Sequence, residues 1–205
     1  MILCDIGNTS YHFLDEEIQY KKSVEDFDPL TLKRQVYYIC VNHDIKKILD
    51  KLDNWKDISV FIDIDKYYKT MGIDRIFACE AIEDGVIIDA GSAVTVDMVK
   101  DGKFQGGYIY PGIKAVEQTY KNISTALNYS LNFEFKLDIM PKNSQNAISY
   151  GYLKTLYCEV MSHGMDIFLT GGDAKQFAKI FPHAKVNEML IFDGMKKIMK
   201  KADLC

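Results

Sequence analysis

Two short acidic glycine turns carry the residue types in this chain that are best suited to chemistry. Cys4-Asp5-Ile6-Gly7-Asn8-Thr9-Ser10 follows an apolar run at residues 1–3, and Ile88-Asp89-Ala90-Gly91-Ser92-Ala93-Val94-Thr95 follows a second such run that starts at Val86. A β-like run also follows each turn, so each is expected at the tip of a hairpin. Glycine lets the backbone approach an anion, amides and hydroxyls donate to it, and a carboxylate holds the accompanying metal. Either turn alone could be a plain β-turn. Two such turns in one chain predict two lobes that bind the two ends of a polyphosphate.

The composition limits the classes of protein that the chain can represent. It has 205 residues, 48% of them hydrophobic, which is enough for one large domain or two small ones. Its formal net charge of −4 argues against a nucleic-acid partner. Five scattered cysteines without a C-x-x-C pair indicate buried thiols in a reducing compartment. No apolar run approaches the roughly 20 residues of a membrane span, so we expect a soluble, cytoplasmic protein with no membrane partner.

The hydrophobic pattern predicts an α/β protein with a repeated hairpin. In the first part, strands are expected at 1–6, 10–14, 18–22, 36–41 and 59–62, with an amphipathic helix over 43–55. In the second part, strands are expected at 86–89, 94–99, into Gly106-Gly107 and at 166–170, with helices from Pro111-Gly112 to Leu127 and over 144–161, 174–181 and 193–202. The repeat indicates internal duplication, with an N-terminal lobe at 1–84 and a C-terminal lobe at 85–205.

Common nucleotide-binding motifs are missing from the sequence. The chain has no G-x-x-x-x-G-K-[ST] and no G-x-G-x-x-G, which argues against P-loop enzymes, Rossmann dinucleotide binders and protein kinases. The architecture that remains is the duplicated, two-lobed actin-like (ribonuclease H-like) fold, shared with hexokinase and Hsp70, in which hairpins of this kind hold the nucleotide. The leading function is therefore a nucleotide-dependent phosphotransferase.

Six short pieces, in this order, carry a resemblance to one family. They are Asp5–Thr9, Gly72-Ile73-Asp74-Arg75, Asp89–Asp97, Gly106–Gly112, Asn143–Ile148 and Gly171-Gly172-Asp173. With these pieces the chain resembles the type III pantothenate kinases, which phosphorylate pantothenate in the first step of coenzyme A biosynthesis. Only fourteen residues separate Asp74 from Asp89, fewer than is typical of the family, so the helix after Asp74 must be short.

The resemblance implies an ATP site and two cations. The residues it assigns to ATP are Asp5, Ile6, Gly7, Asn8 and Thr9 in the first turn, Gly91, Ser92 and Ala93 in the second, and Gly171 and Gly172 against the adenosine. It places Mg²⁺ at Asp5 and a monovalent cation, K⁺ or NH₄⁺, at Asp89. It also implies a homodimer, to which the helix that starts at Pro111 contributes through a stripe that includes Tyr120 and Leu127.

The resemblance assigns the catalytic base to Asp74 and further substrate contacts to Gly72, Ile73 and Arg75. A carboxylate can orient a primary hydroxyl and take its proton late in phosphoryl transfer. From the residues alone, Gly-Ile-Asp-Arg could equally be a turn with a weak surface ion pair.

Four more residues are candidates for binding pantothenate. Ser144 falls where the family has a threonine that reaches the substrate from the partner subunit, with Asn143 as the next candidate; Ser144 could also be a helix N-cap. Tyr67 and Tyr68 lie roughly where the family has a substrate-contacting tyrosine, and either could instead pack in the core or an interface. Two alternative functions stay open: a non-catalytic nucleotide-binding regulator of the same fold, and a related kinase with another acceptor.

Overall fold

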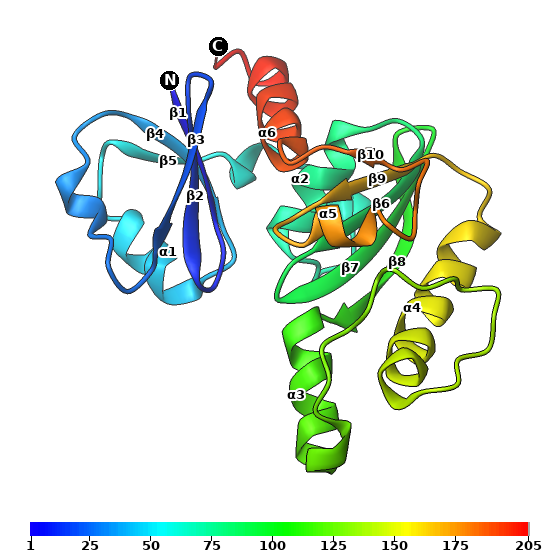
Figure 1. Ribbon diagram of the computed structural model, residues 1–205. Helices are drawn as coiled ribbons and strands as arrows, with labels where there is room; N and C mark the ends of the chain where they lie inside the picture. The colour runs from blue at the N-terminus through cyan, green and yellow to red at the C-terminus, as the bar shows by residue number, and fades with distance from the viewer. Residues whose placement is uncertain (205) are drawn as a thin grey trace. The chain divides into compact units, whose positions relative to one another are not determined.

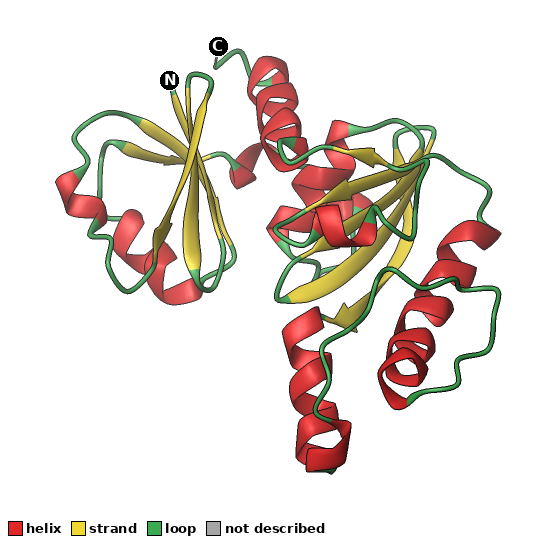
Figure 2. Ribbon diagram, viewed as in Figure 1, coloured by secondary structure: helices red, strands yellow, loops and turns green. Residues whose placement is uncertain are grey.

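The computed structural model describes residues 1–204, which divide into two compact units. Unit 1 comprises Met1–Ile82 and the C-terminal segment from Met189, and unit 2 comprises Glu83–Glu188. Each unit contains one five-stranded sheet with helices beside it (Figures 1 and 2). The expected C-terminal lobe extended to the chain's end, whereas here the last helix is grouped with unit 1.

The sheet of unit 1 is built around the first strand. Its members are β1 (Ile2–Ile6), β2 (Ser10–Asp15), β3 (Ile18–Ser23), β4 (Val36–Cys40) and β5 (Trp55–Asp57), in the order β3-β2-β1-β4-β5. The first three strands are antiparallel, whereas β4 runs parallel to both β1 and β5. Because β1 is central, its residues are almost all buried, and the aromatic side chains of Phe13, Tyr38 and Trp55 fill one side of this core.

The sheet of unit 2 repeats this connectivity. Its members are β6 (Gly85–Ala90), β7 (Ala93–Lys100), β8 (Lys103–Pro111), β9 (Ile167–Thr170) and β10 (Lys185–Val186), in the order β10-β9-β6-β7-β8. Again the first three strands form an antiparallel meander, and the central strand β6 pairs in parallel with β9. The predicted duplicated α/β fold is thereby confirmed.

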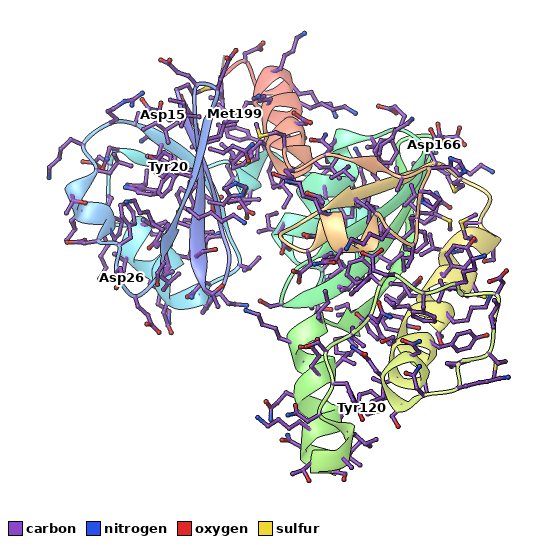
Figure 3. The ribbon with its side chains drawn as sticks, in the orientation of Figure 1. Asp15, Tyr20, Asp26, Tyr120, Asp166 and Met199 are labelled. Carbon is purple, nitrogen blue, oxygen red and sulfur yellow. The ribbon has the colours of Figure 1, made fainter. Side chains whose placement is uncertain are left out.

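The helices follow the strands in each unit. Unit 1 contains α1 (His43–Leu49), α2 (Ile73–Ala81) and α6 (Leu190–Lys201), and unit 2 contains α3 (Ile113–Ile123), α4 (Ser144–Ser162) and α5 (Ala174–Phe177). Helices α2 and α6 pack so closely that a β-carbon on Gly194 would run into the carbonyl of Phe77. Met199, labelled in Figure 3, belongs to this packed face of α6 and is fully buried. Within residues 1–204, no helix is long and apolar enough to cross a membrane.

Four predicted elements differ from the structure. The strand expected at 59–62 is a 3-10 turn, Ser59–Phe61. The Asp57 carboxylate accepts a hydrogen bond from the Ser59 amide, and this contact turns the chain. The edge strand is β5 instead, and the helix predicted over 43–55 ends at Leu49. The helix predicted to reach Leu127 ends at Ile123, after which the Ser124 hydroxyl caps a new 3-10 turn. The helix predicted over 174–181 ends at Phe177.

Candidate functional site

The first acidic turn joins β1 to β2 and presents polar side chains to solvent. Asp5 is half-buried on β1, and Asn8 and Thr9 are exposed at the tip. Backbone amides elsewhere in unit 1 engage the turn's carbonyls: Val24 donates to Thr9 at 3.0 Å and Val41 donates to Ile6 at 3.0 Å. Because these carbonyl oxygens face the protein, the tip suits an anion better than an ordinary turn does.

The second acidic turn joins β6 to β7 and is one residue shorter. The last residue pair before the tip is Ala90–Val94, whereas it is Ile6–Tyr11 in the first turn. The carbonyl of Ala90 accepts a hydrogen bond from the Asp173 amide at 2.9 Å, and the carbonyl of Ser92 accepts one from the Gly112 amide at 3.2 Å. The two turns are therefore held in the same manner, by amides that follow neighbouring strands of the sheet.

The two glycines after β9 differ in what surrounds them. Gly171 has φ +87°, and a β-carbon there would lie well inside 3.0 Å of the Asp89 carboxylate and the Ala90 carbonyl. A β-carbon on Gly172 would meet no atom within 4 Å. The structure thus gives Gly171 a packing role beside Asp89, a role that the sequence pattern did not suggest. Gly172 has the open surroundings that close approach of a ligand requires.

The arrangement of acidic side chains fits one of the two modes by which proteins bind Mg²⁺. Within residues 1–204, no three carboxylate, thiol or imidazole side chains gather into a metal-binding group. Magnesium is commonly held instead by one or two carboxylates together with substrate phosphates and water. Asp5, at the end of the central strand β1 beside a glycine turn, fits that second mode.

Asp74 lies in the first turn of α2, whose N-cap is Gly72. Its Oδ1 accepts a hydrogen bond from the backbone amide of Arg75 at 2.8 Å. Burial raises the pKa of Asp74 above its usual value, although this hydrogen bond and the charge of Arg75 act in the opposite direction. The carboxylate is therefore oriented by the helix terminus and held in surroundings that favour uptake of a proton.

Arg75 contacts one of the two tyrosines, and the other tyrosine contacts a different residue. Arg75 is only 5% exposed, and its Nη1 donates to the hydroxyl of Tyr68 at 2.5 Å. The hydroxyl of Tyr67 instead donates to Glu80 at 3.1 Å, and Glu80 in turn pairs with Lys201 at 3.2 Å. Arg75 is thus a buried side chain, whereas the sequence left open a position on the surface.

The N-terminus of α4 is capped by Asn143, whose Oδ1 accepts the Asn146 amide at 2.9 Å. Ser144 is therefore the first helical residue and not the cap. Sequence reasoning missed a polar network that ties the preceding segment to this end of the helix. The fully buried hydroxyl of Ser149 accepts the Asn132 amide at 2.8 Å, and the Asn132 side chain donates to Asn146 at 3.0 Å.

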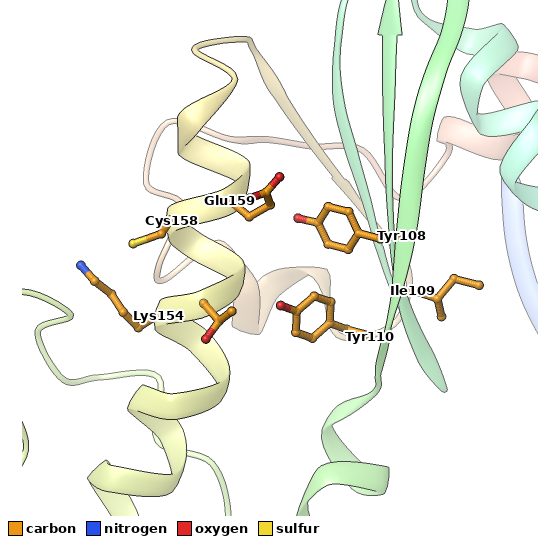
Figure 4. A pocket seen from close by; sticks show the side chains of 7 residues that line it. Tyr108, Ile109, Tyr110, Lys154, Cys158 and Glu159 are labelled. Atoms are coloured by element: carbon orange, nitrogen blue, oxygen red, sulfur yellow. The ribbon is translucent and has the colours of Figure 1, made fainter.

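A cavity of about 590 Å³ lies between β8 and α4 (Figure 4). The side chains that line it include Tyr108 and Tyr110 from β8 and Lys154, Cys158 and Glu159 from α4. The Tyr108 hydroxyl is buried without a hydrogen-bond partner, and burial, followed by the nearby charge of Glu159, raises the pKa of Tyr108. None of the residues assigned to ATP or pantothenate lines this cavity.

Comparisons with known proteins show which family the chain resembles over its whole length. A family model described as type III pantothenate kinase matches residues 48–163. A type III pantothenate kinase from Sulfurimonas denitrificans is 62% identical over 205 residues, which cover the whole of both chains. A solved structure from Campylobacter jejuni, named for the Baf family of transcriptional activators, matches with a TM-score of 0.90 at 37% identity and full coverage of both chains.

A more distant match concerns the fold alone. Component A of (R)-2-hydroxyglutaryl-CoA dehydratase from Acidaminococcus fermentans matches with a TM-score of 0.51 at 13% identity, covering 98% of each chain. Together with the duplicated sheets, this places the chain in the actin-like ATPase fold. The full-length match at 62% identity and the family model, which spans more than half of the chain, establish the narrower relationship: the chain belongs to the type III pantothenate kinase family.

Proposed function

We propose that this protein transfers the γ-phosphoryl group of ATP to the primary hydroxyl of pantothenate, the first step of coenzyme A biosynthesis. The observation that carries the proposal is Asp74, a half-buried carboxylate fixed at a helix N-terminus within the Gly-Ile-Asp-Arg segment of a family member. Cys4 and Cys79 are both buried cysteines, which suits a reducing compartment such as the cytoplasm.

The two turns are assigned to the phosphates of ATP. In unit 1, Asn8 and Thr9 offer an exposed amide and an exposed hydroxyl, and Asp5 would hold Mg²⁺. When bound, Mg²⁺ neutralises charge on the phosphate oxygens. In unit 2, the amides of Ser92 and Ala93 would donate to phosphate, and Gly172 would admit the adenosine.

Asp74 is assigned the role of base. Its carboxylate accepts the proton of the substrate hydroxyl late in the transfer, while the hydroxyl oxygen attacks the phosphorus and the ADP oxygen leaves. The Arg75 amide holds Oδ1, so the second carboxylate oxygen, Oδ2, is the one assigned to the substrate.

Tyr68 is the tyrosine that we assign to pantothenate. The residue is 41% exposed, and its hydroxyl is already oriented by Arg75. The hydroxyl of Tyr67 is directed instead to Glu80, which is itself paired with Lys201. Arg75, which is almost fully buried, would act on the substrate's polar end chiefly through Tyr68.

Asp89 is assigned a monovalent cation, K⁺ or NH₄⁺. Its carboxylate lies against Gly171 at the end of β6, close in sequence to the proposed phosphate ligands of the second turn. A single charge there would offset repulsion between this carboxylate and the phosphates. The assignment depends on this proposed phosphate site and on family membership.

We further propose a homodimer that unit 2 mediates. Ile109 on β8 is 62% exposed and Ile123 on α3 is 67% exposed. Ile123 also lines a cavity of about 380 Å³, together with Tyr110, Val116 and Tyr120, the last labelled in Figure 3. Apolar surface of this kind is typical of an interface. In the dimer, Ser144 and Asn143 would reach pantothenate bound to the partner subunit.

A coupled assay of ADP release tests the proposal. MgATP is supplied with and without pantothenate, at high and at negligible potassium concentration. Turnover that requires both pantothenate and potassium supports the reaction and the cation site together. Bound ATP that is not consumed would favour the non-catalytic regulator, and turnover only with other alcohols would favour a related kinase with another acceptor.

A further inference from the structure

Gly112 lies against the second acidic turn, although neither the sequence pattern nor the proposed reaction gives it a role there. It follows β8 directly and is the N-cap of α3 (Figure 1). A β-carbon at Gly112 would lie well inside 3.0 Å of the carbonyl oxygens of Gly91 and Ser92. These are backbone atoms, so they cannot swing aside as the end of a flexible side chain can.

The need for glycine at position 112 comes from this contact and not from the backbone conformation. Gly112 has φ −69° and ψ 169°, an extended conformation that every residue type adopts. Its amide donates to Ser92 at 3.2 Å, and its carbonyl accepts the first backbone hydrogen bond of α3, from Val116 at 3.1 Å. Gly112 therefore connects the turn to the start of a helix.

The first turn provides an internal comparison. Val24 occupies the corresponding place in unit 1, directly after β3, and its amide donates to Thr9 at 3.0 Å. Valine is accepted there beside a turn that spans residues 7–10 between paired strand residues, whereas the second turn spans only residues 91–93. The same hydrogen bond thus coincides with a glycine only beside the shorter turn.

From these contacts we infer that Gly112 is a positioning residue for phosphate binding by the second turn, an inference that rests on the proposed ATP site. Residues 1–204 contain no cis peptide bond, and in a trans peptide the N–H points opposite to the C=O. With the carbonyls of Gly91 and Ser92 against Gly112, the amides of Ser92 and Ala93 point away from it. A β-carbon at position 112 would rotate both peptide planes and turn both donors away from the phosphate.

The test compares Gly112→Ala with Gly151→Ala. Gly151 lies in α4, where an added β-carbon meets no atom within 4 Å. Isothermal titration calorimetry with the magnesium complex of adenosine 5′-(β,γ-imido)triphosphate measures binding without turnover. Misdirecting one or two hydrogen bonds to a charged group should raise the Kd of Gly112→Ala by about 10- to 100-fold. The Kd of Gly151→Ala should stay within twofold of the wild-type value.

Further readouts separate positioning from general destabilisation. Gly112→Ala should raise the KM for ATP and leave the KM for pantothenate unchanged. A merely structural defect would instead lower the active fraction of the enzyme without changing either KM. Hydrogen exchange of the peptide 88–95 should be faster in Gly112→Ala only. A Kd for the imido analogue within twofold of wild type would overturn the inference.

Two outcomes are read separately. If Gly112→Ala does not fold, amide NMR of the wild-type protein decides: the Ser92 and Ala93 signals must shift on addition of the imido analogue, and unchanged signals would refute the inference. If the wild type binds the analogue but does not phosphorylate pantothenate, the proposed reaction fails, while the measured Kd values still decide the role of Gly112.

Discussion

The guanidinium of Arg75 donates a hydrogen bond to the hydroxyl of Tyr68, and its Cζ lies 5.7 Å from the centroid of the same ring. The arginine is almost fully buried, whereas the tyrosine is 41% exposed. A cation that is fixed by its surroundings thus orients an accessible phenol. This relationship distinguishes the two adjacent tyrosines, which the sequence could not separate.

Replacing each tyrosine with phenylalanine should give different results. Tyr68→Phe removes a hydroxyl assigned to pantothenate, so we expect the KM for pantothenate to rise several-fold. This rise corresponds to a loss of binding energy on the order of 0.5–1.5 kcal/mol. Tyr67→Phe removes the contact with Glu80 and should lower the melting temperature without changing that KM. Steady-state kinetics and thermal unfolding of both variants test the assignment, and a KM effect in Tyr67→Phe alone would reverse it.

A double-mutant cycle tests whether Arg75 acts through Tyr68. Arg75→Lys keeps a charge but loses the planar fork that reaches the phenol, so it should raise the KM for pantothenate as Tyr68→Phe does. If the arginine acts through the tyrosine, the double variant should be no worse than the more impaired single variant. Additive losses would indicate that Arg75 contacts the substrate independently.

Replacing Asp74 with asparagine should nearly abolish turnover and preserve the fold. General-base catalysis typically contributes about 10²- to 10⁴-fold, and kcat should fall within that range. The Kd for the non-hydrolysable ATP analogue should stay unchanged, because the asparagine keeps the shape of the side chain. Single-turnover kinetics and calorimetry make this measurement, and full activity in Asp74→Asn would exclude the residue as base.

The raised pKa of Asp74 predicts two dependences on pH. Because folding disfavours its ionised form, the native state is penalised once pH rises above the unfolded pKa, about 3.9. Asp74→Asn should therefore be at least as stable as wild type at pH 7, with no difference below pH 3 or so. The acid limb of kcat/KM should also lie above an ordinary carboxyl pKa. A variant that is less stable at pH 7 than wild type would contradict the burial effect.

The strands and turns were predictable where local chemistry decides the structure. The run at 86–89 and the glycine turn after Asp89 gave β6 and its hairpin, because buried strands and acidic glycine turns both leave clear patterns. The prediction of a strand at 59–62 was wrong, because a short apolar run does not show that the Asp57 side chain bends the chain there. Pairing of Trp55 with Val36 is a long-range contact that no local pattern encodes.

The sequence supplied candidate residues for the site but not the contacts that support them. Asp74 could be proposed from a short motif and Tyr67 and Tyr68 only as an undecided pair, whereas the contact of Gly171 with Asp89 depends on two strands that are far apart in sequence. The sequence likewise predicted a helix over 193–202 but not that α2 packs against it. Motifs reveal which groups do chemistry, and tertiary packing decides what holds them.

Gly171→Ala should impair the cation site beyond what backbone strain alone explains. A non-glycine residue at φ +87° loses about 1–2 kcal/mol of stability, and the added β-carbon also displaces the Asp89 carboxylate. Gly164→Ala is the matched control, since Gly164 has φ +61° but open surroundings. Both variants should melt at lower temperature. Only Gly171→Ala should require a higher potassium concentration for half-maximal activity, and equal potassium requirements would remove Gly171 from the cation site.

The proposed dimer predicts that one exposed isoleucine matters and another does not. Ile123→Glu places a charge on the apolar face of unit 2, so light scattering should detect a monomer. Ile18→Glu changes an isoleucine that is 70% exposed on β3 of unit 1 and should remain dimeric. Because Ser144 is proposed to act across the interface, monomeric Ile123→Glu should still bind the ATP analogue but lose pantothenate turnover. A fully active monomer would show that one chain contains the complete pantothenate site, and the role of Ser144 across the interface would then be excluded.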